Sequence, residues 1–403
     1  MLDTHEALAI ILASVRPLGA EHVELKKAYS RTLAADIIAR ENLPPFDNSS
    51  MDGFAVMAAD LERATPSTPV LLNIVGEASA GNVFKGRLRT GEAVRIMTGA
   101  KIPAGADSVV PVEVTEIRDD KRVACVAPIA LGANIRRAGE DIQKNSAALR
   151  RGHLLTPARL GVLAALGITR VRVVRQPLVK ILATGDELVP YHVKPKAGQI
   201  RNSTSHVLQG YVERAGAIGR FLGIVGDEKK RLQKAIRSGL DADVLLITGG
   251  VSMGKYDLVK DTLQALGVRI RFWRVNIKPG KPLLFGTFGS TLVFGLPGNP
   301  VSTSVTFMQF VKPALAAMLQ RIPDVPAYLS AILDEPISKR DGKRHFVRGV
   351  ATMHNGALHV RPHGPQSSGM VSSLAHANCL IPVPEEVDIL DTGSNVMVQF
   401  TDW

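Results

Sequence analysis

The stretch from about residue 177 to 320 constrains the fold most, because near-continuous apolar strands alternate there with amphipathic helices. Strands buried on both faces read as apolar runs, and helices between them connect parallel neighbours. The rhythm predicts a three-layer α/β/α domain built on a parallel sheet. The expected elements, in chain order, are strand LVKILAT, helix SHVLQGYVERAG, strand GRFLGIVG, helix KKRLQKAIRSGL, strand ADVLLIT, helix LVKDTLQALG, strands RIRFWRV and TLVFG, and a helix from Ser302 to Leu319.

The rest of the chain follows other patterns, and its 403 residues predict two to four domains. Helical spacing predicts helices over residues 2–15 and 23–34. Short alternating strands separated by Gly and Pro turns predict a β-rich insertion between residues 70 and 128. A second set of strands after residue 328 predicts a small C-terminal barrel or sandwich. The fold class is therefore multi-domain α/β plus β.

The cysteine content and the hydropathy pattern indicate in which cellular compartment the protein is expected. The two cysteines, Cys125 and Cys379, exclude a disulfide framework and a cysteine-based zinc site, and they fit a reducing compartment. The chain has no run of about 18 apolar residues, so we expect no membrane span. Its N-terminus lacks the basic region and cleavage site of a signal peptide, which predicts a cytoplasmic protein.

The formal net charge of +12 predicts an anionic partner. Nucleic acid is not expected, because aromatic residues make up only 5% of the chain and no helix-turn-helix, RNP or zinc-finger pattern occurs. A small, multiply charged ligand explains the surplus equally well. A solvated basic face without a partner stays an open alternative.

Three expected strands run directly into glycine-containing loops, and ligands of α/β sheets collect at such strand ends. The first loop holds two carboxylates, Asp186 and Glu187, in a pattern that suits metal binding but also an ordinary polar turn. The second runs from Thr248 to Gly254, where glycines allow backbone N–H groups to approach a phosphate before the next helix begins. The third runs from Pro297 to Ser302.

Three sets of residues in and between these loops have structural or chemical interpretations. Asp257 either caps a helix or holds Mg²⁺ beside a phosphate. Asn299 and Pro300 suit the cap and first position of the following helix. Lys278 and Lys281 lie in a loop that two prolines stiffen, which favours a fixed cationic site over solvated lysines. Together the loops predict an anion site for a phosphate-bearing ligand with Mg²⁺, and the residues alone leave its reaction open.

Eight motifs in this order resemble the molybdopterin molybdenumtransferase family, which includes MoeA of bacteria and the E domain of gephyrin-type proteins. The motifs are DNSSMDGFAV, RIMTGA, GEDI, ILATGDEL, IRNSTS, TGGVSMGKYD, KPGKP and LPGNPVS. The resemblance implies four domains and a homodimer. Their boundaries would be 1–42 with 140–174 for an elongated N-terminal dimerisation domain, 43–139 for the β-rich insertion, 175–322 for the α/β/α molybdopterin-binding domain, and 323–403 for a C-terminal β-barrel.

The resemblance also implies the reaction: adenylylated molybdopterin and molybdate give molybdenum cofactor and AMP, with Mg²⁺. It assigns metal and phosphate handling to Glu187, Asp227 and Asp257, and a facing wall from the second subunit to Asp52, Thr98, Arg137 and Asp141. The remaining residues that it implies bind substrate are Thr248, Gly249, Gly250, Ser252, Lys278, Lys281, Pro297, Asn299, Pro300, Arg344, Ser367 and Ser368.

Two other functions compete with metal insertion. One is a non-catalytic molybdopterin-binding scaffold, and the other is a molybdopterin adenylyltransferase, which would consume ATP. As protein partners the resemblance implies a molybdopterin adenylyltransferase and apo-molybdoenzymes. The ten histidines lack ligand spacing, so no histidine-based transition-metal site is expected.

Overall fold

The computed structural model describes the whole chain except residues 120, 251–257, 324–327 and 402–403. The chain forms two compact units, each built from separated segments. Unit 1 comprises Met1–Ala35, Gly152–Thr156 and Arg170–Trp403, and unit 2 comprises Asp36–Arg151 and Pro157–Thr169. The division into four domains is finer than this and stays a prediction.

The elements of unit 1 in chain order are α1 (Thr4–Ser14), β1 (Ala20–Glu24), β12 (Arg170–Val174), β13 (Leu178–Thr184), β14 (Leu188–Val189), β15 (Ile200–Arg201), α3 (Thr204–Arg214), β16 (Ile218–Val225), α4 (Lys229–Arg237), β17 (Val244–Thr248), α5 (Leu258–Ala265), β18 (Arg269–Trp273), β19 (Ile277–Lys278), β20 (Leu284–Phe288), β21 (Thr291–Leu296), α6 (Pro300–Thr306), α7 (Lys312–Met318), β22 (Leu329–Leu333), β23 (Ile337–Ser338), β24 (Arg344–His354), β25 (Ala357–Pro362), α8 (Ser372–His376), β26 (Cys379–Val383), β27 (Ile389–Leu390) and β28 (Asn395–Phe400). Those of unit 2 are β2 (Ile37–Ile38), β3 (Asn48–Ser49), β4 (Gly53–Val56), β5 (Val70–Ala78), β6 (Glu92–Ile96), β7 (Ser108–Pro111), β8 (Thr115–Asp119), β9 (Arg122–Cys125), β10 (Ile135–Arg136), β11 (Ala147–Leu149) and α2 (Pro157–Ala165).

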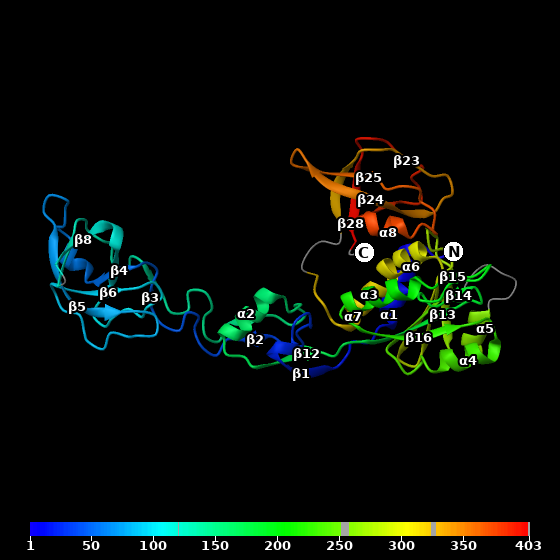
Figure 1. Cartoon of the computed structure of the whole chain (residues 1–403), viewed down its shortest axis with the longest axis horizontal. Helices are drawn as coiled ribbons and strands as arrows, with labels where there is room; N and C mark the ends of the chain where they lie inside the picture. The colour runs from blue at the N-terminus through cyan, green and yellow to red at the C-terminus, as the bar shows by residue number, and fades with distance from the viewer. Residues whose placement is uncertain (120, 251–257, 324–327, 402–403) are drawn as a thin grey trace. The chain divides into compact units, whose positions relative to one another are not determined.

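The expected three-layer α/β/α arrangement is confirmed in unit 1. A six-stranded sheet has the order β16-β13-β17-β21-β20-β18. Along β17, Val244 and Leu246 pack into the core that includes α3, α6 and α7, while Leu245 and Ile247 pack into the core that includes α4 and α5. Strand side chains alternate between faces, so one apolar strand fills both cores. Figure 1 shows α4 and α5 on one side of this sheet and α1, α3 and α6 on the other.

The sheet is mixed, which corrects the expectation of an all-parallel sheet. Strands β16, β13, β17 and β21 are parallel, whereas β20 pairs antiparallel with β21 and β18 pairs antiparallel with β20. Only two residues, Gly289 and Ser290, separate β20 from β21, and Gly289 has a φ of +57°. A glycine of this conformation in a two-residue connection forms a β-hairpin, which the sequence interpretation overlooked.

The C-terminal strands close into the expected small barrel. Strands β24, β25, β22, β28 and β26 follow one another by hydrogen bonding, and β26 pairs back onto β24, so five strands form a ring. Val347, Ile381 and Val398 are among the residues that fill it. Strand β19 begins the loop that contains Lys278 and Lys281, called the lysine loop here. It pairs in parallel with the start of β24, with Lys278 opposite His345. This pairing brings the lysine loop to the barrel.

Residues 23–34 do not form the expected α-helix, and only Leu25–Lys27 form a short 3-10 helix. Residues 20–24 form β1, which pairs antiparallel with β12 so that Glu24 lies opposite Arg170. Thr32 and Leu33 make isolated bridges to Leu154 and Val173. Long-range pairing therefore overrides a local helical periodicity, as it commonly does for short segments.

Unit 2 contains the expected β-rich insertion. Its main sheet has the order β7-β4-β6-β5-β9-β8. Phe54, Val56 and Val110 lie in one core of this unit, which also holds Cys125 as a free thiol. Among the described residues, no helix is long and apolar enough to cross a membrane.

Candidate active site

Three carboxylates gather where β13 and β16 end. The backbone N–H of Asp227 donates to Asp186 Oδ1 at 3.0 Å. Partial burial and the negative charges of Asp186 and Glu187 raise the pKa of Asp227. The three side chains are therefore close enough to repel one another. A bound cation relieves such repulsion.

Two glycines let these carboxylates fold over the strand ends. A Cβ at Gly185 would lie 2.3 Å from Glu187 Oε2, and one at Gly226 would lie 2.4 Å from Asp186 Oδ1. Gly185 also has a φ of +141°, which other residues rarely adopt. Any side chain at either position would displace a carboxylate from the edge of the sheet.

The donor set suits a magnesium ion that is also held by its substrate. Among the residues that the structure describes, no three His, Cys, Asp or Glu side chains converge into a metal cage. Mg²⁺, however, usually takes one or two protein carboxylates and completes its shell with phosphate and water oxygens. Glu187 and Asp227 fit that pattern. Asp257 and Ser252, which were predicted beside them, lie outside the described residues.

The glycines after β17 serve close packing. A Cβ at Gly249 would lie 2.2 Å from the carbonyl oxygen of Thr184, and the N–H of Gly249 donates to Leu296 O at 3.3 Å. That N–H is therefore already used within the protein. Thr248 is buried, and a Cβ at Gly250 would lie 2.8 Å from Thr184 Oγ1. The Thr184 hydroxyl is buried and has no hydrogen-bond partner in the described part of the chain.

A cavity of about 440 Å³ brings together three separated segments that were predicted to bind substrate. Asn299 stands at the N-cap of α6 but makes no capping hydrogen bond with its side chain, and its Nδ2 donates to Ser368 Oγ at 3.0 Å. Pro300 is the first residue of α6, as expected. The predicted residues that line the cavity are Lys278, Lys281, Pro297, Asn299, Ser367 and Ser368.

One carboxylate faces two lysines of this cavity. Asp341 Oδ2 lies 3.4 Å from Lys278 Nζ and 3.1 Å from Lys343 Nζ, and His345 Nε2 lies 2.7 Å from Asp341 Oδ1. Although burial raises the pKa of Asp341, hydrogen bonds from His345 and Lys343 hold it well below its usual range. Asp341 is therefore a fixed anion. Lys281 has no ion pair within the described residues, so it is the least neutralised cation of the cavity.

In unit 2, two of the predicted residues contact each other. Asp52 Oδ1 accepts hydrogen bonds from the backbone N–H and the hydroxyl of Thr98, both at 2.7 Å. These bonds lower the pKa of Asp52, so its carboxylate stays ionised. The pair fixes the orientation of an exposed carboxylate.

The other two predicted residues of unit 2 make separate contacts. Arg137 Nη1 lies 2.7 Å from Asp47 Oδ2, and the N–H of Ala138 donates to Asp47 Oδ1 at 2.8 Å. Asp141 is exposed, and its N–H donates to Leu43 O. Asp47, which the sequence interpretation did not select, therefore fixes the loop that contains Arg137 and Ala138.

Comparison with known proteins identifies the family. The MoeA N-terminal region (domain I and II) matches residues 2–167, a probable molybdopterin binding domain matches 180–317, and the MoeA C-terminal region (domain IV) matches 330–400. The molybdopterin molybdenumtransferase of Haemophilus influenzae is 36% identical over 95% of this chain and 94% of its own length. That of Bacillus subtilis is also 36% identical, over 94% and 89%. The chain belongs to the molybdopterin molybdenumtransferase family.

A solved structure supports this membership over the entire fold. The molybdopterin biosynthesis MoeA protein of Pyrococcus horikoshii OT3 has a TM-score of 0.86 and 31% sequence identity, with full coverage of both chains. The molybdopterin molybdenumtransferase fold therefore accounts for both the α/β/α domain and the C-terminal barrel.

The cavity of about 440 Å³, called the lysine cavity below, is lined by Lys343 and not by Arg344. Arg344 pairs with Glu385, with Nη2 3.0 Å from Oε2. Arg344 is the first residue of β24, and Lys343 directly precedes the strand. A substrate-binding role for Arg344 stays a prediction, and Lys343 is a basic residue of the cavity that the sequence interpretation did not select.

Arg348 is a further residue that the sequence interpretation missed. Its side chain is fully buried, and Nη2 donates to Pro365 O at 2.9 Å and Ser367 O at 3.3 Å. Its backbone N–H donates to Gln366 Oε1 at 2.9 Å. The Nε and Nη1 atoms have no partner in the described structure, and burial lowers the pKa of this arginine. Arg348 thus fixes residues 365–367, called the serine segment here, which lead into the cavity. It also places a buried positive charge beside them.

Proposed function

We propose that this chain inserts molybdenum into adenylylated molybdopterin, with molybdate as the metal source and AMP as the second product. The observation that carries the proposal is the pairing of two features at one sheet edge. Carboxylates follow β13 and β16, and a lysine- and serine-lined cavity follows β21. Family membership supports the same reaction. Two anionic reactants repel each other, so a site for this reaction must supply cations to both.

The lysine cavity is the proposed molybdate site. Lys278, Lys281 and Lys343 supply positive charge, while Ser367 and Ser368 supply hydroxyl donors. Asp341 holds two of these lysines in place before the oxyanion binds. No protein nucleophile is required, because the thiolates that bind the metal belong to the substrate.

The carboxylates are the proposed magnesium and phosphate site, with Glu187, Asp227 and Asp257 as its residues. Bound there, Mg²⁺ would neutralise phosphate oxygens of the substrate. Without a cation, partial burial and the charges of Asp186 and Glu187 raise the pKa of Asp227, so a bound cation would favour its ionised form.

We also propose that the protein works as a homodimer, in which Asp52, Thr98, Arg137 and Asp141 act on substrate held by the other copy. The ion pairs and hydrogen bonds that orient Asp52 and Arg137 are suited to such a role. A molybdopterin adenylyltransferase would supply the substrate, and apo-molybdoenzymes would accept the product. A single-copy mass in analytical ultracentrifugation at working concentration would contradict the homodimer.

Product analysis tests the reaction. Purified protein mixed with adenylylated molybdopterin, molybdate and Mg²⁺ is expected to release AMP and to reconstitute a cofactor-free molybdoenzyme without ATP. Chelation of Mg²⁺ is expected to abolish the release, and its re-addition to restore it. An adenylyltransferase would require ATP, and a scaffold would release no AMP above the protein-free rate. Either result would exclude the proposed reaction.

Lys343 and Arg344 are neighbours in the sequence, so their substitutions form a matched pair for measuring molybdate affinity. Lys343→Met is expected to weaken molybdate binding at least tenfold, because the lysine lines the cavity and no other group replaces its charge. Arg344→Met is expected to change it less than threefold, because Arg344 neutralises Glu385. Isothermal titration with molybdate measures both. The reverse ranking would place the oxyanion on the other side of β24.

A further inference from the structure

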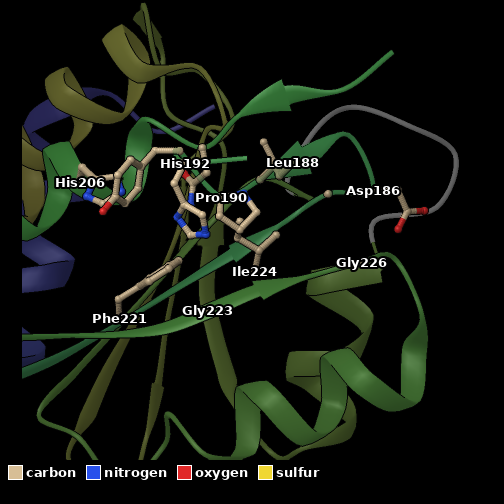
Figure 2. Close-up of a pocket in the computed structure, with 12 residues that line it drawn as sticks. Asp186, Leu188, Pro190, His192, His206, Phe221, Gly223, Ile224 and Gly226 are labelled. Carbon is tan, nitrogen blue, oxygen red and sulfur yellow. The ribbon is translucent and has the colours of Figure 1, made fainter. Parts of the chain in front are cut away.

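Two cavities of unit 1 differ in the charges that line them. The cavity beside the carboxylates, of about 660 Å³, has largely aromatic and aliphatic walls with Asp186 at one end (Figure 2). None of its described lining residues is a lysine or an arginine. The lysine cavity is lined by Lys278, Lys281 and Lys343. Asp341 lies outside this lining and contacts Lys278 and Lys343. An oxyanion that enters the lysine cavity therefore meets cations that a carboxylate already holds.

The three contacts of the Asp341 carboxylate are unequal. Its Oδ1 lies 2.7 Å from His345 Nε2, whereas its Oδ2 lies 3.1 Å from Lys343 Nζ and 3.4 Å from Lys278 Nζ. The Lys278 side chain is 57% exposed, compared with 26% for Lys343 and 12% for His345. A long contact to an exposed ammonium contributes little stability. Lys278 is therefore the partner that Asp341 gives up most easily.

The turn that carries Asp341 is held in place by the neighbouring strand connection. Asn276 Nδ2 donates to the carbonyl oxygen of Gly342 at 3.0 Å, and the N–H of Arg344 donates to Asn276 O at 3.2 Å. Gly342 has a φ of +58°, a conformation that favours glycine. Because both its backbone and His345 hold it, the Asp341 carboxylate stays behind when the flexible Lys278 side chain turns toward a ligand.

His345 holds Asp341 without neutralising it. Burial lowers the pKa of His345, and the positive charges of Lys278 and Lys339 lower it further, although the hydrogen bond to Asp341 opposes these effects. The imidazole is therefore neutral near pH 7, and its Nε2–H donates to the ionised carboxylate. The negative charge of Asp341 thus remains available to the lysines.

We propose that Asp341 is an internal counter-ion that makes the lysine cavity selective for dianions, an inference that rests on the proposed function. Lys281 has no ion pair among the described residues. A monoanion can pair with Lys281 alone, or it can take Lys278 from Asp341 and so exchange one ion pair for another. Neither gains much. A dianion such as molybdate pairs with Lys278 and Lys281 together, so it gains an ion pair in total. Selectivity then comes from a charge that disfavours the wrong ligand.

Molybdate titration of the full-length protein tests this role at constant ionic strength. The salt is either chloride or lactobionate, a monoanion whose disaccharide body hinders approach to two lysines at once. The wild-type Kd is expected to differ by less than about twofold between the salts. In lactobionate, Asp341→Asn is expected to bind molybdate about tenfold more tightly, because a nearby negative charge is lost. In chloride, it should lose about fivefold or more of that affinity, because its unpaired lysines then accept a monoanion.

Asp334→Asn is the matched control. Asp334 Oδ1 lies 2.7 Å from His359 Nδ1 in the same barrel, so this variant also removes a carboxylate beside a histidine, but Asp334 does not contact or line the cavity. It should leave molybdate affinity and the chloride effect unchanged. Asp341→Ser should repeat the result of Asp341→Asn, and thermal unfolding curves show whether both variants are folded.

The direction of the change separates the explanations. If Asp341 only positions the lysines, Asp341→Asn binds molybdate more weakly than wild type and shows no added chloride effect, and the counter-ion role is wrong. Unchanged affinity would overturn it as well. Lys281→Met is expected to weaken molybdate binding with or without Asp341. If that substitution has no effect in either background, or if the wild type binds no molybdate, the proposed oxyanion site itself is refuted.

Discussion

Replacing Asp227 by Asn is expected to reduce the rate of molybdenum insertion by about a thousandfold, the size of effect seen when one charged group of a transition-state site is lost. The substitution removes a carboxylate from the cluster at the end of β16 while keeping its size. Because neighbouring negative charges and burial raise the pKa of Asp227, its ionised form is disfavoured in the folded protein. Asn should therefore leave stability unchanged or slightly increased at neutral pH.

The adjacent residue supplies the control. Glu228 is exposed and pairs with Arg231 at 2.7 Å, three positions further on. Glu228→Gln removes the same charge one residue away and should keep more than half of the activity. Rates with preformed adenylylated molybdopterin, together with thermal unfolding curves, test both variants. An Asp227→Asn enzyme with near-normal turnover, or one that unfolds at much lower temperature, would contradict a chemical role.

Replacing Arg348 by Met is expected to weaken molybdate binding by about tenfold to a hundredfold, or about 1.4 to 2.7 kcal/mol. The side chain would still fill the interior, but the carbonyls of Pro365 and Ser367 would lose their donor. The segment that carries Ser367 into the cavity would then be less fixed. A buried positive charge that no carboxylate compensates among the described residues would also be lost. The protein should stay folded, since removing an unpaired buried charge offsets the lost hydrogen bonds.

Arg340→Met is the matched variant, because Arg340 is an exposed arginine of the same C-terminal domain. It should leave molybdate affinity unchanged. Arg348→Lys should fall between wild type and Arg348→Met, since it keeps the charge but loses the fork geometry. Calorimetric titration with molybdate provides the affinities. Arg348→Met with wild-type affinity would show that the arginine serves only the packing of the barrel.

The sequence predicted the α/β/α layers where each strand or helix is recognisable from its own local pattern of apolar residues. The apolar run of β17 predicted a strand buried on both faces, and its side chains do fill two cores. The glycine loops marked the strand ends correctly because a glycine is required there. At Gly185 the backbone angle and the space taken by Glu187 both demand it.

The failures share one physical cause, which is dependence on partners distant in sequence. Residues 23–34 have helical spacing, yet β12 recruits residues 20–24 into a sheet. Asn299 stands at the N-cap of α6 as expected, but its side chain contacts Ser368, a residue far along the chain, and makes no capping bond. The cavity that Tyr191, His206 and Phe221 line had no recognisable sequence motif, because these residues come from separate elements.

Arg348 could have been identified from the sequence, because it is a charged residue in an apolar strand pattern. A charged residue within the apolar run FVRGVAT is out of place in a barrel strand, since burying an unpaired charge is costly. Such residues persist where another function holds them, and here the side chain organises the serine segment. Lys343 gave no comparable signal, because it is one of several basic residues in the stretch KRDGKR.

The position of the metal reactant tests the central claim most directly. Crystals of the full-length protein soaked in molybdate and measured at the molybdenum absorption edge would locate the ion by anomalous scattering. We predict one strong peak within contact distance of Lys278, Lys281 and Lys343 and of the hydroxyls of Ser367 and Ser368. A peak elsewhere, with this cavity empty at saturating molybdate, would contradict the assignment of the reaction to this edge of the sheet.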